Sequence, residues 1–572
     1  MMTAWRLLRA AALVAGGALL TTDLAGALEA GADPLAIGRR IYREGLLPSG
    51  QPLQGLAPAN VKLAGADAAC ATCHRRSGYG SSEGPIEVRS ITGPALFGSP
   101  PAPPPSASAT TRPGLSPVEA ARANASVLRV VRMAAFAGTR QRPAYDEASL
   151  ARAIREGIDV TGRRMNASMP RYALEPAALE SLTAYLKTLS VQASPGVTED
   201  RIHFATVIQP GTDPARRRAL LEVLQTYMHD RNQGLRAEVR REEAGSVRLR
   251  RTYREWMLHV WDLSGPSDTW ARQLEAYDSK QPVFALVSGL GNASWGPIHE
   301  FSERFEVPCI FPQVDVPVLA DRDFYTVYLS RGMTLEAQAL AKFLRDEGER
   351  GPVTQVFRRG EVSAAGAEAF RRAWAAVTGT APVDRVLDEA PGEAFWQQLA
   401  RQTPRATLVL WLPPRDLAQA QALTAAGSQV KVIYLSSNLN PGQRTGLAAD
   451  GEGRVRLVYP QDLPAVREAR LEVARRWLRS KGVALSEEKV QMNAYLAATV
   501  TGMLVSHSMD TYSREFLLER MEHRLGTALE LSIYPHLSLG PGQRYASKGS
   551  YIVQVGGADD RQLKPVSDWI VP

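Results

Sequence analysis

The sequence is poor in cysteine and, beyond its first residues, has no long apolar run. Three cysteines in 572 residues exclude a disulfide-stapled scaffold. No later stretch is long and apolar enough to cross a bilayer. A phosphate-binding loop, a Gly-x-Ser-x-Gly elbow and nucleic-acid-binding motifs are also missing, and the histidines after residue 200 lack metal-ligand spacing. These absences disfavour a hydrolase, a nucleotide-dependent enzyme and a nucleic-acid partner.

The N-terminus carries the one pronounced apolar run. Arg6 and Arg9 precede apolar residues 10–20, and Ala25-Gly26-Ala27 offers a small-residue cleavage site. This order is typical of a secretory signal peptide over residues 1–27. We therefore expect a mature protein in the periplasm, without a membrane span. The remaining length is too great for one core and predicts several domains.

The most specific motif is Cys70-Ala71-Thr72-Cys73-His74. Two thiols at this spacing, followed by histidine, are typical of covalent haem c attachment, with the imidazole as an axial iron ligand. A disulfide and half of a zinc site are the alternatives. The third cysteine, Cys309, lies in the apolar run 307–311 and is expected to be a buried, inert thiol.

Residues 33–195 resemble a class I cytochrome c, which implies an all-α domain. A small residue and an aromatic, Gly38 and Tyr42, share one face of a predicted helix that starts at Asp33 or Pro34 and runs through residues 35–42. In this family such a pair packs against the C-terminal helix, here expected over residues 176–189 with Tyr185 at the crossing. A proline-rich stretch at 99–115 and a helical pattern at 117–137 are insertions relative to the family.

The candidates for the second axial ligand of the haem iron can be reduced by elimination. Because His74 is the first histidine of the sequence and the next follows residue 200, the segment offers only Met133, Met165 and Met169. Met169 stands in Met-Pro-Arg-Tyr-Ala-Leu, which resembles the ligand loop of the family and implies thioether coordination. Pro94 resembles the family's proline whose carbonyl accepts a hydrogen bond from the proximal imidazole.

Charge is unevenly distributed along the chain. The formal charge is +8, and residues 33–195 hold 19 Lys and Arg against 12 Asp and Glu. A basic redox domain can steer toward an acidic partner, here a periplasmic dehydrogenase or another cytochrome, although the excess can also serve solubility alone.

After a polar linker at 191–196, strand-like runs alternate with helical patterns, which predicts parallel sheets covered by helices. The predicted strands are 202–208, 258–263, 283–290, 307–311, 324–329, 353–357, 407–412, 430–435 and 455–459. The steps at 283–289, 305–312 and 328–341 make residues 200–572 resemble a type I periplasmic ligand-binding protein of the branched-chain amino acid class. The resemblance implies a two-lobed α/β fold.

In such a fold a small molecule binds between lobes, near the loops that follow strands. The ligand-binding candidates on these loops are Gln209, Ser288, Asn292, Gln313 and Ser436. An ordinary turn is the alternative at each position, and no acidic residue can be assigned by motif to hold a substrate ammonium.

These features predict an electron-transfer cytochrome c coupled to a small-molecule or partner-binding module, rather than an enzyme. One alternative is a solute receptor of the transport or sensing type with a regulatory haem. A second is a periplasmic oxidoreductase that reduces its own haem.

Overall fold

The computed structural model describes residues 33–83, 86–98, 142–242, 254–318, 320, 322–359, 362–440, 447, 453–506, 508, 512–525, 532–540, 542–555 and 563–572. The chain divides into two compact units, Met1–Ala193 and Ser194–Pro572. The division falls inside the predicted linker. The predicted signal peptide, the proline-rich stretch and Met133 lie outside the described residues.

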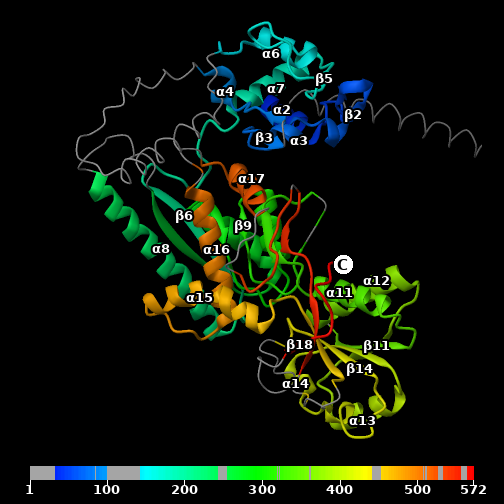
Figure 1. Cartoon of the computed structure of the whole chain (residues 1–572). Coiled ribbons are helices and arrows are strands. Elements are labelled where there is room, and N and C mark those ends of the chain that lie inside the picture. The colour runs from blue at the N-terminus through cyan, green and yellow to red at the C-terminus, as the bar shows by residue number, and fades with distance from the viewer. Residues whose placement is uncertain are drawn as a thin grey trace, which may run out of the picture. The chain divides into compact units, whose positions relative to one another are not determined.

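The first unit is mainly helical around a small core (Figure 1). Its helices are α2 Pro34–Glu44, α3 Cys70–His74, α4 Gly93–Phe97, α6 Glu147–Glu156 and α7 Pro176–Thr188. It is not all-α as predicted. Short strands β1 Gln54–Leu56, β2 Lys62–Ala64 and β5 Arg171–Tyr172 form an antiparallel sheet, and β3 Ser81–Glu83 pairs with β4 Ile86–Val88. These strands have two or three residues each, too few to show the period-2 pattern that reveals a strand in a sequence.

Helices α2 and α7 cross closely, as the sequence predicts. Asp33 caps α2 by accepting the Leu35 N–H, and Pro34 supplies its first turn. At the crossing, a Cβ added to Gly38 would lie 2.0 Å from the Ser181 carbonyl oxygen. The rings of Tyr42 and Tyr185 pack alongside in a tilted arrangement, with centroids 5.4 Å apart and 54° between their planes. The crossing therefore requires glycine.

The second unit consists of two α/β lobes. The first lobe has a parallel sheet in the order β16-β10-β9-β8-β6-β7. The second lobe has the order β12-β11-β13-β14-β15-β17-β18, parallel as far as β15 and antiparallel beyond. In each lobe the first five strands along the chain follow the doubly wound order 2-1-3-4-5.

The predicted strands are found at β6 Arg201–Ile208, β7 Glu255–Asp262, β8 Ala285–Val287, β9 Cys309–Ile310, β10 Thr326–Ser330, β11 Val353–Arg358, β13 Thr407–Trp411, β14 Val432–Ser436 and β15 Val455–Tyr459. Four further strands were not predicted from the sequence: β12 Val383–Leu387, β16 Tyr545–Ser547, β17 Tyr551–Val555 and β18 Leu563–Pro565. Central strands such as β13 and β14 are buried along their whole length, which explains their continuous apolar runs.

Helices cover both sheets. Those of the first lobe include α8 Pro214–Glu242, α9 Trp270–Lys280, α10 Gly296–Arg304, α15 Pro464–Ser480, α16 Glu488–Ser506 and α17 Arg514–Arg524. The second lobe carries α11 Met333–Asp346, α12 Val362–Thr378, α13 Glu393–Gln402 and α14 Pro414–Leu417. No helix among the described residues meets the length and apolarity needed to span a membrane.

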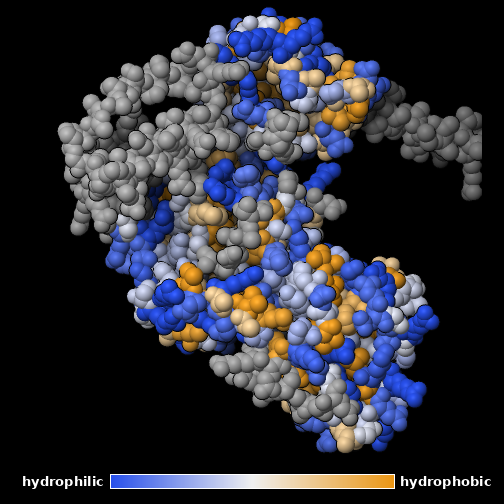
Figure 2. Space-filling view, viewed as in Figure 1, coloured by the Kyte–Doolittle hydropathy of each residue, from blue (hydrophilic) through white to orange (hydrophobic). Residues whose placement is uncertain are grey.

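The chain passes between the lobes three times. It leaves the first lobe after β10, returns after β15 and leaves again after β16. Each connection is short: 331–332, 460–463 and 548–550. Figure 2 shows hydrophilic and hydrophobic residues mingled over the visible face of this unit.

Candidate functional site

The Cys70–His74 motif forms a single short helix, α3, in the first unit. Residues three apart on a helix share a face, so Cys70 and Cys73 project to one side. Both thiols are unpaired. Burial raises the pKa of Cys70 to about 12. The two free thiols therefore lie on one helical turn, in an arrangement that suits the predicted attachment of a haem, and His74 follows directly.

The His74 imidazole is held through one ring nitrogen. Nδ1 of His74 lies 2.9 Å from the Arg89 carbonyl oxygen. A carbonyl can only accept, so Nδ1–H donates and, in the neutral ring, Nε2 is the unprotonated nitrogen. Burial lowers the pKa of His74, which favours this neutral ring.

The predicted role of Pro94 is wrong. Its carbonyl accepts the N–H of Gly98 at 3.1 Å, within α4, and Arg89 takes its place at His74. Thr92 caps α4 by accepting the Ala95 N–H, so Pro94 stands in the first turn of a helix that uses its carbonyl. The sequence shows the proline but not which carbonyl faces the ring.

Met169 lies in a turn just before β5. Its N–H donates to the Asn166 carbonyl at 3.2 Å, and its side chain is half-buried. Tyr172, three residues on, belongs to the core against which Cys70 packs. Burial raises the pKa of its hydroxyl, and the Cys70 and Cys73 thiols add to this shift. The turn therefore leads into a strand that lies beside the motif.

In the second unit, three predicted residues lie close to the switch point of the first lobe, which is the place between β6 and β8 where the strand order reverses. Gln209, Ser288 and Gln313 follow β6, β8 and β9, and all three are buried. The Gln209 side-chain oxygen accepts from the N–H groups of residues 292 and 293, at 3.1 and 3.0 Å. Gln313 donates to the Ser288 hydroxyl at 3.3 Å and to the Val490 carbonyl at 3.1 Å.

Through these contacts Gln209 fixes the loop after β8, and Gln313 links the end of β9 to Ser288 and to α16. Asn292 is exposed, and its amide nitrogen would lie 3.0 Å from a Cβ at Gly211. Ser288 adopts a left-handed backbone, with φ of 56°, at the end of its strand. The backbone of the switch point is thus shaped by the predicted residues.

Ser436, at the end of β14, belongs to a group in the second lobe. Its hydroxyl donates to Glu336, a fully buried residue on α11. The other carboxyl oxygen of Glu336 accepts from the Ser437 hydroxyl at 2.8 Å and the Asn438 N–H at 3.1 Å. Burial raises the pKa of Glu336 to about 7, although these donors and the nearby Lys489 oppose the shift.

Residues of both lobes meet at this group. Lys489, on α16 of the first lobe, donates to the Asn438 side-chain oxygen at 3.2 Å. The Asn438 amide nitrogen is buried and has no hydrogen-bond partner among the described residues. Tyr534 hydrogen-bonds Asn493 and lies near Lys489, Asp315 and Glu336, which all act on its pKa, although burial dominates and raises it.

Three residues of this group, Glu336, Lys489 and Asp315, were not predicted as site residues from the sequence. A signal for Glu336 exists, because it is a charged residue on the apolar face of a helix that continues through Ala337, Leu340 and Ala341. Lys489 carries no such signal, since lysines are mostly exposed and a lysine in a sequence is ordinarily interpreted as a surface residue.

A second cluster joins α10 to β10. His299 contacts the Tyr328 hydroxyl through Nδ1 at 3.1 Å and the Asp323 carboxylate through Nε2 at 3.3 Å. The Glu303 carboxylate, which lies within 4.8 Å of the His299 ring and the Asp323 carboxylate, accepts the backbone N–H groups of residues 324–326. Because these atoms already bind protein groups, the cluster has a structural role and connects α10 to the segment that leads into β10.

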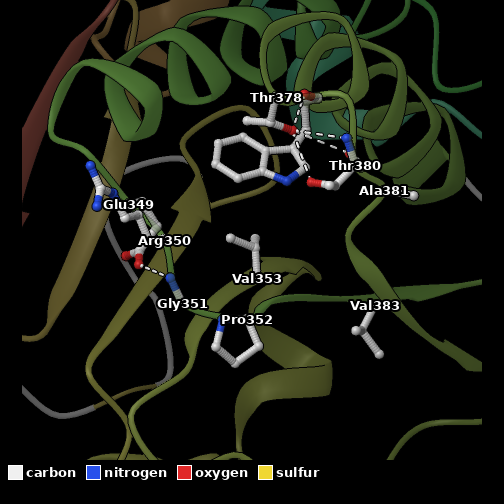
Figure 3. A pocket seen from close by; sticks show the side chains of 10 residues that line it. Glu349, Arg350, Gly351, Pro352, Val353, Thr378, Thr380, Ala381 and Val383 are labelled. Atoms are coloured by element: carbon white, nitrogen blue, oxygen red, sulfur yellow. Dashed lines mark hydrogen bonds between the residues drawn. The ribbon is translucent and has the colours of Figure 1, made fainter.

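A hollow of about 200 Å³ lies at the amino ends of β11 and β12 (Figure 3). Glu349, Pro352, Thr378 and Thr380 line it, and Glu349 accepts the Gly351 N–H. Parallel sheets bind ligands at their carboxyl ends, so this hollow is at the opposite edge from the predicted residues.

Two tryptophans and the remaining thiol can be placed as well. Trp295 and Trp411 are fully buried, so packing rather than ligand contact explains them. The Trp411 indole donates to Gln355 at 3.1 Å. Cys309 is also fully buried, and burial raises its pKa to about 12, as expected for an inert thiol.

Neither the family models nor the curated proteins searched match this chain. Solved structures that it resembles are substrate-binding proteins. A fatty acid ABC transporter substrate-binding protein from Thermomonospora curvata aligns at 13% identity, over 67% of this chain and 95% of that one, with a TM-score of 0.45. A branched chain amino acid ABC transporter protein from Thermus thermophilus, with bound valine, aligns at 12% identity over 65% and 97%, with a TM-score of 0.46. A substrate-binding periplasmic protein from Ralstonia solanacearum aligns at 14% identity over 64% and 99%, also at 0.46.

Proposed function

We propose that the second unit is a periplasmic receptor for a small molecule. The contact between Lys489 and Asn438 carries this proposal, because it brings polar groups of both lobes together beside the carboxyl end of β14. Ligands of doubly wound sheets bind at such carboxyl ends. The lysine ammonium and the unpartnered Asn438 amide offer hydrogen-bond donors there.

A ligand screen tests the receptor proposal. Thermal unfolding of the full chain is measured with amino acids, carboxylic acids, alcohols and sugars, and a ligand that binds the folded state raises the midpoint. The Lys489→Met variant should weaken the response strongly, whereas Lys564→Met, at an exposed position on β18, should leave it intact. Equal responses in both variants would contradict the proposed site.

We also propose that the first unit carries one haem c and transfers electrons. Cys70 and Cys73 would hold the porphyrin by thioether bonds, Nε2 of His74 would bind the iron, and Met169 would complete the coordination. The donor set fits, because two free thiols share a helical face and the Arg89 carbonyl fixes the imidazole through its other nitrogen. When bound, the haem supplies one-electron chemistry.

Mass spectrometry of periplasmic protein under denaturing conditions tests the attachment. One haem mass should remain on the chain and should be lost from the Cys70→Ser, Cys73→Ser double variant. A haem that dissociates on denaturation would contradict covalent attachment.

The redox state separates the three functional readings. A solute receptor with a regulatory haem binds its ligand with different affinities in the oxidised and reduced forms. An oxidoreductase reduces its own haem when the ligand is added. An electron carrier is not reduced by the ligand alone, and instead accepts electrons from a periplasmic dehydrogenase or another cytochrome.

A further inference from the structure

The loop that bears Met169 is closed by an arginine of the next strand. Arg171 stands in β5, where it pairs with Leu56 of β1 and is thereby fixed in register. Its guanidinium donates to the carbonyl oxygen of Met169, two residues earlier. A charged donor forms a stronger hydrogen bond than a neutral one, so this contact holds the backbone from which the methionine side chain extends.

Gly157 makes room for this guanidinium. It ends α6 in a left-handed conformation, with φ of 70°. A Cβ at this position would lie 2.0 Å from Cζ of Arg171. The Gly157 carbonyl also accepts the Met165 N–H at 2.8 Å, so the same glycine anchors the start of the loop.

A second arginine fixes the chain on the C-terminal side of Met169. Arg155, on the last turn of α6, donates to the Leu174 carbonyl through Nε at 3.1 Å and Nη2 at 2.5 Å. Helix α6 therefore fixes the chain after Met169 through the Arg155 hydrogen bonds, and Gly157 at its end leaves the space that the Arg171 guanidinium occupies. The surroundings of Met169 are tied to a helix and to a sheet.

We propose that Arg171 is a positioning residue that holds Met169 at the haem iron. The inference rests on the proposed haem site. A methionine on a loop binds iron weakly unless its backbone is held, because the free loop gains conformational entropy when the thioether dissociates. Loss of the Arg171 contact should therefore favour dissociation of Met169, and exogenous ligands should then reach the iron.

The test uses the full holo-protein and imidazole as the competing ligand. Imidazole affinity is measured by the change in the haem spectrum of the oxidised protein, together with the reduction potential. Arg171→Ala should bind imidazole about ten-fold more tightly and have a lower potential, because a charged hydrogen bond is worth roughly that factor. Arg163→Ala, at an exposed position in the same loop, should match the wild type.

Gly157→Ala provides an independent variant that keeps the arginine. Its added methyl group displaces the guanidinium, so imidazole affinity should again rise. If Arg171→Ala fails to accumulate as holo-protein, Arg171→Lys decides the matter: it retains the charge, lacks the planar fork, and should show an intermediate increase.

The outcomes separate this inference from the haem proposal. If Met169→Ala opens the iron to imidazole while the Arg171 and Gly157 variants behave as the wild type, the positioning role is wrong. If Met169→Ala itself behaves as the wild type, the assignment of the iron ligand is wrong.

Discussion

Glu336 is a carboxyl group enclosed by hydroxyl and amide donors. Its pKa rises from an ordinary value of 4.5 to about 7 because burial disfavours its charged form. Between these values the folded chain retains a proton that the unfolded chain releases. The stability contributed by this proton is complete below pH 4.5 and is lost as the pH rises through 7.

The Glu336→Gln variant should remove this pH dependence. In the wild type, the free energy of unfolding of the second unit should decrease by about 3 kcal/mol at most between pH 4.5 and 8. The amide has no proton to lose, so the variant should show a smaller decrease. Urea unfolding at both pH values measures it, with Glu389→Gln at an exposed position as control. Identical pH slopes in the wild type and the Glu336 variant would contradict the assignment.

At the scale of elements, the α2 and α7 crossing is the part of the first unit that the sequence predicted best. Gly38, Tyr42 and Tyr185 meet as expected, because helical periodicity places them on facing surfaces. The strand β12 was not predicted, because it has no such apolar pattern. It is an edge strand with four of its five residues at least partly exposed, so it lacks the apolar run that revealed the central strands.

Gly38→Ala should destabilise the first unit by about 2 kcal/mol, since overpacking a tight contact costs in this range. The new methyl group would meet the Ser181 carbonyl and force the helices apart. Leu35→Ala, at a position 41% exposed on the same helix, should have a small effect. Calorimetry of both variants measures the difference, and equal losses would show that the crossing tolerates a side chain.

At the scale of the whole molecule, the two units have separate cores. Each should unfold in its own transition, and haem absorbance should identify the one that belongs to the first unit. The Cys70→Ser, Cys73→Ser variant should lower that transition alone, because a ligand held by the folded state stabilises only the unit that binds it. A single transition that shifts as a whole would show that the units are energetically coupled.

The sequence by itself determined what is written in local patterns. The spacing of Cys70, Cys73 and His74, the apolar periodicity of α7 and the continuous apolar runs of the buried strands all depend on residues within a few positions of one another. The tertiary structure decided which distant groups meet. Arg89 replaced Pro94 at His74, and Glu336, one hundred residues before Ser436, closed the polar group of the second lobe. Such pairings are set by sheet order and helix packing, because hydrogen bonds form between atoms that are near in space, whatever their separation along the chain.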